Sequence, residues 1–311
     1  MKLPPLPPLR HIVPIYGLQA KSQLSQNFIF DLSVTDRIVE KLGDDLDKAL
    51  VIEVGPGPGS LSRSILNAGA TNLVSVEKDP RFQPLLNQLA DASKNRFHFL
   101  IDDMRTVEYD KILAAAGTSL SEAIKTKTYI VGNLPFAVAT PMLVNWLRLC
   151  SHRVGLFQNP NNVEFLLMFQ KEVGERITAR PGTRSRSRIS VLSQSVCDVK
   201  LTQDIPRGVF VPKPKVNAAV VRLRPSSSPV LQGCDIEALE AVLRWSFASK
   251  RKTIKNSIRS SIPEGTRILG LAGIDPDVRA ETLSTEEFVR LAQICCQEGL
   301  IPVRDPEHGR P

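Results

Sequence analysis

The sequence lacks the features that mark membrane-spanning, disulfide-linked and metal-binding proteins. No apolar run in its 311 residues is long enough to cross a bilayer, so we expect no membrane insertion. Its five cysteines show no CxxC spacing, and their odd number favours free thiols in a reducing compartment. Its four histidines have no metal-ligand spacing, so we expect no metal. The length fits one large domain and a smaller one.

Acidic residues are missing from the first 30 positions, and the whole chain carries a net charge of +8. This excess favours a polyanionic partner, either nucleic acid or an acidic membrane surface. A segment without acid is one feature of mitochondrial targeting sequences, although the prolines at 4, 5, 7 and 8 should prevent a regular amphipathic helix from starting there. We predict an N-terminal extension over 1–22 with a targeting role, and a mitochondrial matrix location. The cytoplasm and the nucleus are the alternatives.

Strand and helix patterns alternate over residues 49–149. The predicted strands are 49–54, 72–76, 96–101 and 129–132, and the predicted helices are 60–68, 81–90 and 141–149. The alternation predicts an α/β fold, in which helices cover both faces of a parallel sheet and ligands bind at the carboxyl ends of the strands. The polar inserts 117–127 and 151–164 are predicted surface loops.

The later part of the chain continues this pattern and then becomes helical. Further elements of the α/β domain are predicted at 165–169, 171–178, 189–195 and 218–223. The predicted helices beyond the serine-rich stretch are 236–247, 250–260, 266–272 and 285–297. We therefore predict an α/β domain over 23–224, a linker over 225–231, a small C-terminal α-helical domain over 232–300 and a tail over 301–311.

Three consecutive predicted strands end in residues suited to a nucleoside ligand. Residues 53–59 read Glu-Val-Gly-Pro-Gly-Pro-Gly, and glycines let the backbone approach a ligand closely. Glu77 ends the second strand, where it can accept hydrogen bonds from ribose hydroxyls. Asp102 ends the third, where it can accept from an adenine amino group. Taken alone, the glycines are also compatible with a tight turn that binds no ligand, and Asp102 is also compatible with a solvent-exposed acid in a loop. Taken together, these residues predict a nucleoside ligand but do not distinguish a nicotinamide dinucleotide from S-adenosylmethionine.

The fourth predicted strand ends in Asn133-Leu134-Pro135-Phe136. The Asn133 side-chain oxygen and the Leu134 carbonyl oxygen can both accept from one NH₂ group, while Pro135 restricts the backbone before it. Phe136 can stack on the ring that carries the amine. The alternative is a structural turn with a buried phenylalanine. This run predicts a site that holds the exocyclic amine of a base.

These runs resemble those of the KsgA-type ribosomal RNA adenine dimethyltransferase family, and most of all its mitochondrial branch. The other matching runs lie at 3–7, 23–28, 169–173, 210–216 and 274–276. Ser25 stands where much of the family has glycine. The resemblance implies a Rossmann-like class I S-adenosylmethionine-dependent methyltransferase fold. It also implies a substrate of two adjacent adenines in a hairpin loop of small-subunit rRNA, of the 12S type in mitochondria.

The resemblance also implies roles for individual residues. Gln26, Asn27, Phe28 and Ile29 would flank the methionine end of the cofactor, and Phe210 would sandwich the target base. The predicted catalytic residues are Asn133, Leu134, Pro135, Phe136 and Phe210. The predicted cofactor-binding residues are Gln26, Asn27, Phe28, Ile29, Glu53, Gly55, Gly57, Glu77, Lys78, Asp102, Asp103 and Asn133.

Basic residues gather in three stretches that we predict to contact RNA phosphates. These residues are Arg176, Arg180, Arg184, Arg186 and Arg188, then Lys213 and Lys215, and finally Lys250, Arg251, Lys252 and Lys255. Solvated surfaces are the usual fate of charge runs. Three such stretches in a chain with a base-binding motif favour phosphate contact instead.

We therefore predict a monomeric rRNA adenine N6,N6-dimethyltransferase that uses S-adenosyl-L-methionine. Its partner would be small-subunit rRNA or the pre-ribosomal small subunit, whose assembly it would support. A second hypothesis is a non-catalytic nucleic-acid-binding factor of ribosome assembly or of the mitochondrial transcription machinery. Glu77, Asp102 and residues 133–136 favour the enzyme, because a pure binding protein has no need of them. A nicotinamide-dependent oxidoreductase is the third hypothesis, and residues 133–136 disfavour it.

Overall fold

The computed structural model describes residues 2–18, 26–231 and 233–302, and the chain divides into two compact units. The first unit comprises residues 1–145, 152–174 and 200–224, and the second comprises 146–151, 175–199 and 225–311. Three predicted segments lie partly outside the described residues. They are the tail, from residue 303 onward, the N-terminal extension and the run 23–28. The predicted domain boundaries stay a prediction.

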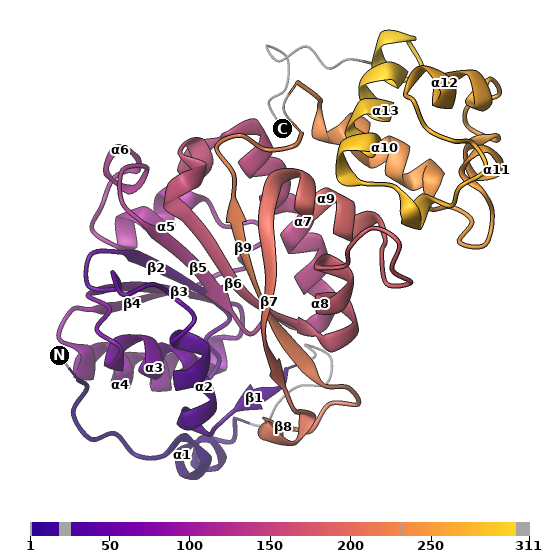
Figure 1. Cartoon of the computed structure of the whole chain (residues 1–311). Coiled ribbons are helices and arrows are strands. Elements are labelled where there is room, and N and C mark those ends of the chain that lie inside the picture. The colour runs from indigo at the N-terminus through magenta and orange to yellow at the C-terminus, as the bar shows by residue number, and fades with distance from the viewer. Residues whose placement is uncertain (1, 19–25, 232, 303–311) are drawn as a thin grey trace. The chain divides into compact units, whose positions relative to one another are not determined.

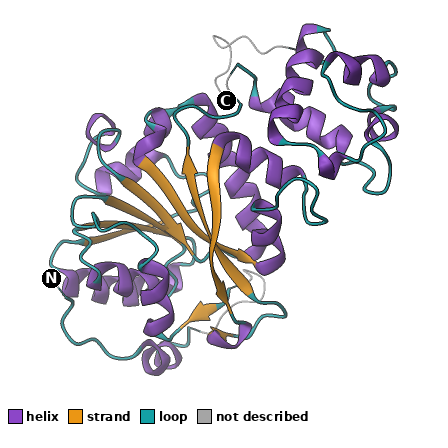
Figure 2. Cartoon of the chain, in the orientation of Figure 1, coloured by secondary structure: helices purple, strands orange, loops and turns teal. Residues whose placement is uncertain are grey.

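A seven-stranded sheet with the strand order β4-β3-β2-β5-β6-β9-β7 forms the centre of the fold (Figures 1 and 2). Its strands are β2 (Leu50–Val54), β3 (Asn72–Glu77), β4 (Phe97–Ile101), β5 (Thr128–Gly132), β6 (Val163–Gln170), β7 (Cys197–Ile205) and β9 (Ala218–Pro225). Strands β2 to β6 are parallel, and β9 is antiparallel to β6. The strand order reverses beside β2, which pairs with both β3 and β5, and a ligand of such a sheet binds at this point.

The central strands form because nearly all of their side chains are apolar and buried. Every residue of β2 and β5 is buried, as expected for a parallel sheet covered on both faces. The helices between the strands are α3 (Ser60–Asn67), α4 (Gln83–Ser93), α5 (Tyr109–Ala115), α6 (Leu120–Ala123), α7 (Phe136–His152) and α8 (Lys171–Ile177). Figure 1 shows α3 and α4 on one face of the sheet and α5 on the other.

The N-terminal residues form elements that the sequence patterns do not predict. Helix α1 (Leu9–Ile15) begins directly after the prolines, so the expectation that they prevent a helix holds only for residues 4–8. Its Leu9, Ile12 and Val13 join the core cluster of the first unit. Helix α2 (Leu32–Val39) packs beside α3, and strand β1 (Phe28–Ile29) pairs antiparallel with β8 (Phe210–Val211).

The second unit is built mainly from helices. They are α9 (Arg188–Val196), α10 (Ile236–Ser246), α11 (Ile254–Ile258), α12 (Gly265–Leu271) and α13 (Thr285–Gln297). Helix α13 begins with a capping box, in which Ser284 accepts from the Glu287 backbone and the Glu287 side chain accepts from the Ser284 backbone. Among the described residues, no helix has the length and apolar content needed to span a bilayer.

Most predicted elements exist, but several boundaries differ. Helix α7 begins at Phe136 rather than at Pro141, so the proline lies inside the helix. The helix predicted over 250–260 begins only at Ile254, because the residues before it form turns. The predicted loop 117–127 contains the short helix α6, which a capping box at Ser119 starts. The predicted linker begins one residue inside β9, which ends at Pro225.

Candidate active site

The carboxyl ends of β2, β3 and β5 surround a pocket in the first unit. The lining of this pocket includes the glycine loop, Glu77 and residues 133–136. A second pocket shares Gln26, Gly55, Glu77, Leu134 and Pro135 with the first and adds Lys78, Asp102 and Asp103. The strand ends therefore line two adjoining pockets.

The glycine loop after β2 brings the backbone close to this space. Gly57 has φ +53° and donates its backbone N–H to Glu77 Oε2 at 2.9 Å. A Cβ atom at Gly57 would lie 3.0 Å from the ring of Phe28, so a larger residue there would displace that ring. Gly59 is the N-cap of α3, whose first N–H groups are suited to bind an anion or the negative end of a dipole.

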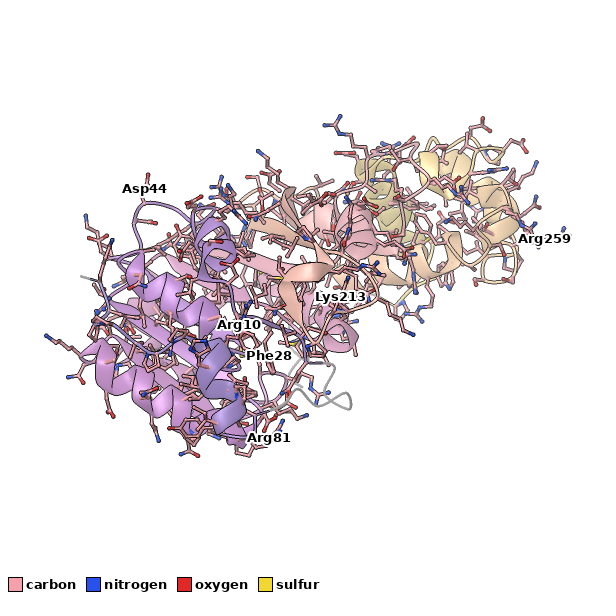
Figure 3. All side chains as sticks on the ribbon, turned by 90° about the horizontal axis from the view of Figure 1, so that it is seen from below. Arg10, Phe28, Asp44, Arg81, Lys213 and Arg259 are labelled. Atoms are coloured by element: carbon pink, nitrogen blue, oxygen red, sulfur yellow. The ribbon has the colours of Figure 1, made fainter. Side chains whose placement is uncertain are left out.

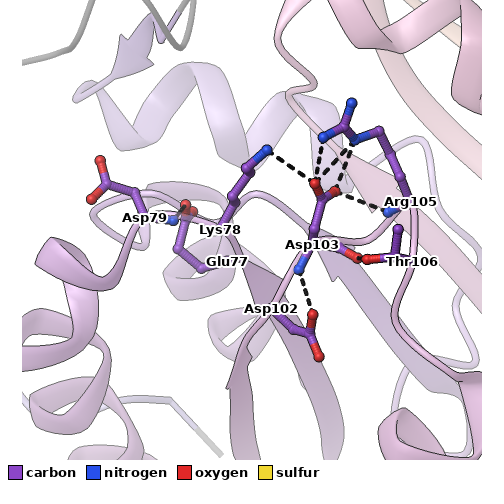
Figure 4. A network of polar contacts seen from close by, with 7 residues as sticks. All are labelled: Glu77, Lys78, Asp79, Asp102, Asp103, Arg105 and Thr106. Carbon is purple, nitrogen blue, oxygen red and sulfur yellow. Dashed lines mark hydrogen bonds and ion pairs between the residues drawn. The ribbon is translucent and has the colours of Figure 1, made fainter.

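Glu77 is a buried acceptor at the end of β3, as Figure 4 shows. Its carboxylate accepts from the backbone N–H groups of Gly57 and Asp79, at 2.9 and 2.7 Å. Burial raises the pKa of Glu77, and the two backbone hydrogen bonds oppose that rise. The carboxylate is thus held rigidly, with its position fixed from both sides.

Asp102 and Asp103 follow β4 and belong to the same polar network (Figure 4). The backbone N–H of Asp102 donates to the Glu77 carbonyl oxygen at 2.9 Å, which aligns the two strand ends. Asp103 pairs with Arg105 at 2.5 Å and with Lys78 at 3.0 Å. Hydrogen bonds from Arg105 hold the pKa of Asp103 well below its ordinary value. Asp103 is thus engaged by cations, whereas the Asp102 carboxylate accepts only a backbone N–H from the described residues.

Two buried polar atoms in the first pocket have no hydrogen-bond partner among the described residues. They are Glu53 Oε1 and Ser60 Oγ, and their side chains are 1% and 6% exposed. The other oxygen of Glu53 accepts from Ser62 Oγ at 2.5 Å and from Ser75 Oγ at 2.7 Å. Burial raises the pKa of Glu53 to about 7. Unpartnered buried polar atoms are costly, so their presence in a pocket wall indicates a polar ligand.

Asn133 begins the turn from β5 into α7 and also lies in the pocket wall. Its Nδ2 donates to the Asn27 carbonyl oxygen at 2.9 Å, which orients the amide and leaves Oδ1 as an acceptor. Leu134 is buried, while Phe136 is half-buried and packs against the core cluster. Gly132 permits this turn, because a Cβ there would lie 2.7 Å from the Val54 carbonyl oxygen.

The β1–β8 ribbon places Phe28 and Phe210 differently from Phe136. Phe28 packs edge-on against Phe82, with ring centroids 5.3 Å apart, and lines the first pocket. Phe210 is only 2% exposed and belongs to the core cluster beside β1. Among the predicted catalytic residues, Phe210 is the one absent from the linings of these two pockets. Its ring could stack on a base only after a local rearrangement.

The predicted RNA-binding residues fall into both units, and all but one have surface-accessible side chains. Figure 3 labels Lys213, which follows β8 and is exposed, as Lys215 is. Lys250, Arg251 and Lys252 are exposed in the second unit. Lys255 is partly exposed and pairs with Asp277 at 2.5 Å. Arg176, Arg180, Arg184 and Arg188 are exposed.

Arg186 is the exception and corrects the prediction. It is 2% exposed and donates to the carbonyl oxygens of Leu283 and Ala179, at 3.0 Å each. It also donates to Gln194 Oε1 and Thr285 Oγ1. A guanidinium has five donors, and here they satisfy acceptors inside the second unit instead of facing RNA. We therefore remove Arg186 from the RNA-binding set.

Sequence reasoning missed several residues of the two pockets. They are Thr35, Ile38, Ser60, Leu61 and Met168 in the first, and Met104, Arg105 and Met142 among those in the second. Thr35 and Ile38 lie on α2, whose buried residues at 34, 35, 38 and 39 are spaced for a helix face. Ser60 directly follows the glycine loop. These signals could have identified them.

Comparisons with known proteins agree on one family. Residues 17–297 match the family described as ribosomal RNA adenine dimethylase. The chain is 40% identical to "Dimethyladenosine transferase 1, mitochondrial" of Vermamoeba vermiformis, over 94% of this chain and 95% of that protein. It is also 40% identical to the protein of that name from Homo sapiens, over 94% of this chain and 86% of that protein. A solved dimethyladenosine transferase from Plasmodium falciparum has a TM-score of 0.66 and 20% identity, covering 88% of this chain and 98% of that one.

Proposed function

Because the chain belongs to the ribosomal RNA adenine dimethylase family, we propose that its strand-end pocket dimethylates adenine N6 in small-subunit rRNA, with S-adenosylmethionine as the methyl donor. The predicted class I methyltransferase fold is confirmed by the likeness to a solved dimethyladenosine transferase. One observation carries the assignment of the site. Glu77 ends β3, Asp102 and Asn133 directly follow the parallel strands β4 and β5 of the same sheet, and the three residues line two adjoining pockets.

The polar groups of these pockets fit S-adenosylmethionine. Glu77 is placed to accept from the two ribose hydroxyls, and Asp102 to accept from the adenine amino group. The unpartnered atoms Glu53 Oε1 and Ser60 Oγ suit the charged methionine end. Gln26 and Asn27 also line that part, and Gln26 donates to Asp79 at 3.2 Å. When bound, S-adenosylmethionine supplies an activated methyl group on a sulfonium.

The run after β5 would act on the target amine. An exocyclic adenine nitrogen is a weak nucleophile, because its lone pair is delocalised into the ring. Asn133 Oδ1 and the Leu134 carbonyl oxygen can accept both hydrogens of the NH₂ group, which favours a pyramidal nitrogen with a localised lone pair. N6 then gains a methyl group and releases a proton to solvent. Phe136 would hold the base by stacking, worth roughly 1–3 kcal/mol.

Phosphate contacts would supply most of the RNA affinity. The exposed basic residues of both units are suited to this, whereas single base contacts contribute orientation. A target base must leave its stack to reach Asn133, and this costs least in a hairpin loop. The substrate we propose is therefore a pair of adjacent adenines in such a loop, of 12S-type rRNA within the pre-ribosomal small subunit.

We propose the mitochondrial matrix as the place of this activity, since the relatives carry "mitochondrial" in their names. We also propose that one copy of the chain is sufficient, because one copy supplies both the proposed cofactor acceptors and the Asn133 run. A role at the mitochondrial transcription machinery stays a prediction, because none of the site residues requires it.

Methyl transfer to defined RNA tests the proposed function. The protein is incubated with methyl-labelled S-adenosylmethionine and a hairpin from small-subunit rRNA, and the digested nucleosides are identified by mass spectrometry. We expect label in N6,N6-dimethyladenosine at two adjacent loop positions. The matched control is the same hairpin with both adenines replaced by guanine, which should stay unlabelled. Label on a cytosine, on a ribose or in the control hairpin would contradict the proposal.

A further inference from the structure

Glu53 occupies an unusual position in the first pocket. It lies inside the sheet on β2, is 1% exposed, and has one oxygen satisfied by Ser62 and Ser75. Its other oxygen, Oε1, has no partner among the described residues, although Glu53 lines the pocket. A buried carboxylate in a pocket wall, with one oxygen that accepts no hydrogen bond from the described residues, is suited to a ligand that carries positive charge.

The charged groups around Glu53 do not neutralise it. Glu77 on β3 is acidic and raises the pKa of Glu53 further. Asp79, beyond Glu77, is paired with Arg81 at 2.6 Å. Arg63 on α3 is buried, but its Nη1 donates to the Pro7 carbonyl oxygen at 2.8 Å. The α2 residues in the pocket wall are Thr35 and Ile38, and β5 places Val131 beside Glu53, so neither element adds a charge.

We propose that Glu53 is a specificity-determining residue, which favours the cationic cofactor over its neutral product by responding to the sulfonium charge. This inference rests on the proposed function. Methyl transfer breaks the bond between sulfur and the methyl carbon, forms the bond between that carbon and N6, and leaves a neutral thioether. In a pocket of low dielectric, the attraction between the sulfonium charge and an ionised Glu53 is lost at that moment, whereas the ammonium group of the methionine end keeps its charge in both ligands. The product is then held less tightly than the methyl donor.

Because binding of the ligand is coupled to release of a proton, the proposal predicts the direction in which affinity changes with pH. The pKa of Glu53 is about 7, raised by burial. A cation in the pocket favours the ionised form and lowers this pKa, so binding of S-adenosylmethionine releases a proton below about pH 7. Its affinity should therefore rise as the pH increases toward 7 and level off above it. S-adenosylhomocysteine has no sulfonium and should show a smaller rise. A pKa lowered by about one unit corresponds to a tenfold gain in affinity.

The test compares the affinities of the two ligands between pH 5.5 and 8.5 by calorimetry. In the wild type, we expect the preference for S-adenosylmethionine over S-adenosylhomocysteine to increase by about tenfold across this range. In Glu53→Gln, which keeps the shape and removes the charge, the preference should lose this dependence. The ligands' own ionisable groups titrate equally in the wild type and the variant, so comparing the two proteins removes their contribution to the pH dependence. Glu108→Gln is the matched control, since it makes the same change at an exposed position outside both pockets and should leave the pH dependence of the preference unchanged.

A second measurement does not depend on the variant's folding. Wild-type titrations at pH 6.5, in two buffers of different ionisation enthalpy, give the number of protons released by each ligand. We expect more release with S-adenosylmethionine than with S-adenosylhomocysteine. Equal release, or a pH-dependent preference that survives in folded Glu53→Gln, would overturn the role of Glu53 while leaving the proposed function intact. If neither ligand binds the wild type, the proposed function itself fails.

Discussion

The molecule contains two sets of charged residues whose exposure can be predicted to different degrees. One set lies at the strand ends of the first unit, and the other is the arginine-rich stretch 176–188 of the second. Glu77 and Asp102 follow consecutive parallel strands, and parallel strands bring their carboxyl ends to one edge. The arginines lie partly on irregular chain, where the sequence does not determine which side chains turn inward. Arg186 is buried while Arg184, two residues earlier, is exposed. Strand topology thus predicts which side chains gather at one edge better than charge density predicts which side chains are exposed.

The largest effect should come from Asn133, which directly follows β5. Asn133→Ala should slow single-turnover methyl transfer by at least roughly a hundredfold, because an acceptor that acts mainly in the transition state is lost. RNA binding, measured by filter retention on the same hairpin, should stay near wild type. Phe136→Ala should lose less, and Phe136→Tyr should recover part of that loss. A wild-type rate in Asn133→Ala would mean that the run after β5 is structural only.

Arg186 should affect stability and not RNA contact. Arg186→Leu removes the donor to four acceptors, of which the Ala179 carbonyl oxygen keeps a hydrogen bond from Gln194 Nε2, and it should lower the free energy of unfolding by about 3 kcal/mol. Urea unfolding followed by circular dichroism measures this change. The control is Arg184→Ala, which removes an exposed guanidinium and should change stability by less than about 0.5 kcal/mol. If the two variants are equally stable, the contrast between the buried and the exposed arginine is wrong.

Glu77 should affect cofactor affinity. Glu77→Ala removes the proposed ribose acceptor and leaves the N–H groups of Gly57 and Asp79 without a partner. We expect the Kd for S-adenosylmethionine to rise by about tenfold or more. Glu108→Ala removes the same charge from an exposed position and should leave this Kd unchanged. Binding of NAD in place of S-adenosylmethionine would contradict the assignment of the pocket.

The smallest effect should come from the exposed basic residues of the second unit, because each of them would contribute only a small part of the RNA affinity. Their combined replacement by glutamine should reduce the slope of log affinity against log salt by up to about 3, because phosphate contacts release counterions. Cofactor affinity should not change. The variant replaces Lys250, Arg251, Lys252 and Lys255. The control replaces the exposed Lys48, Lys94, Lys111 and Lys125. Equal slopes in the two variants would mean that this surface does not contact RNA.

Regular patterns explain what the sequence predicts well. The strands β2, β3 and β5 are short apolar runs that end in glycine or a polar residue, and their positions agree with prediction to within one residue. Helices α3 and α13 agree equally well, since each has a clear apolar face. The parallel direction of these strands follows from their alternation with helices. The positions of Glu77, Asp102 and Asn133 at one edge follow from that direction.

Long-range pairing explains what the sequence does not predict. Strand β1 has two residues and exists through its pairing with β8, more than 180 residues away. The burial of Phe210 depends on that pairing. The sequence motif around Phe210 therefore points to the residue as a candidate, but it does not predict that the side chain is buried. Helix α1 is stabilised by apolar contacts with the core, and Arg63 holds the segment before it through the Pro7 carbonyl oxygen. Local patterns contain none of this information.

A crystal structure of the protein with S-adenosylmethionine bound would test the central claim most directly. We predict that the ribose hydroxyls lie within hydrogen-bond distance of Glu77, that the adenine amino group lies near Asp102, and that the methyl group faces Asn133. A ligand that binds away from these strand ends, or whose methyl group faces away from Asn133, would contradict the account.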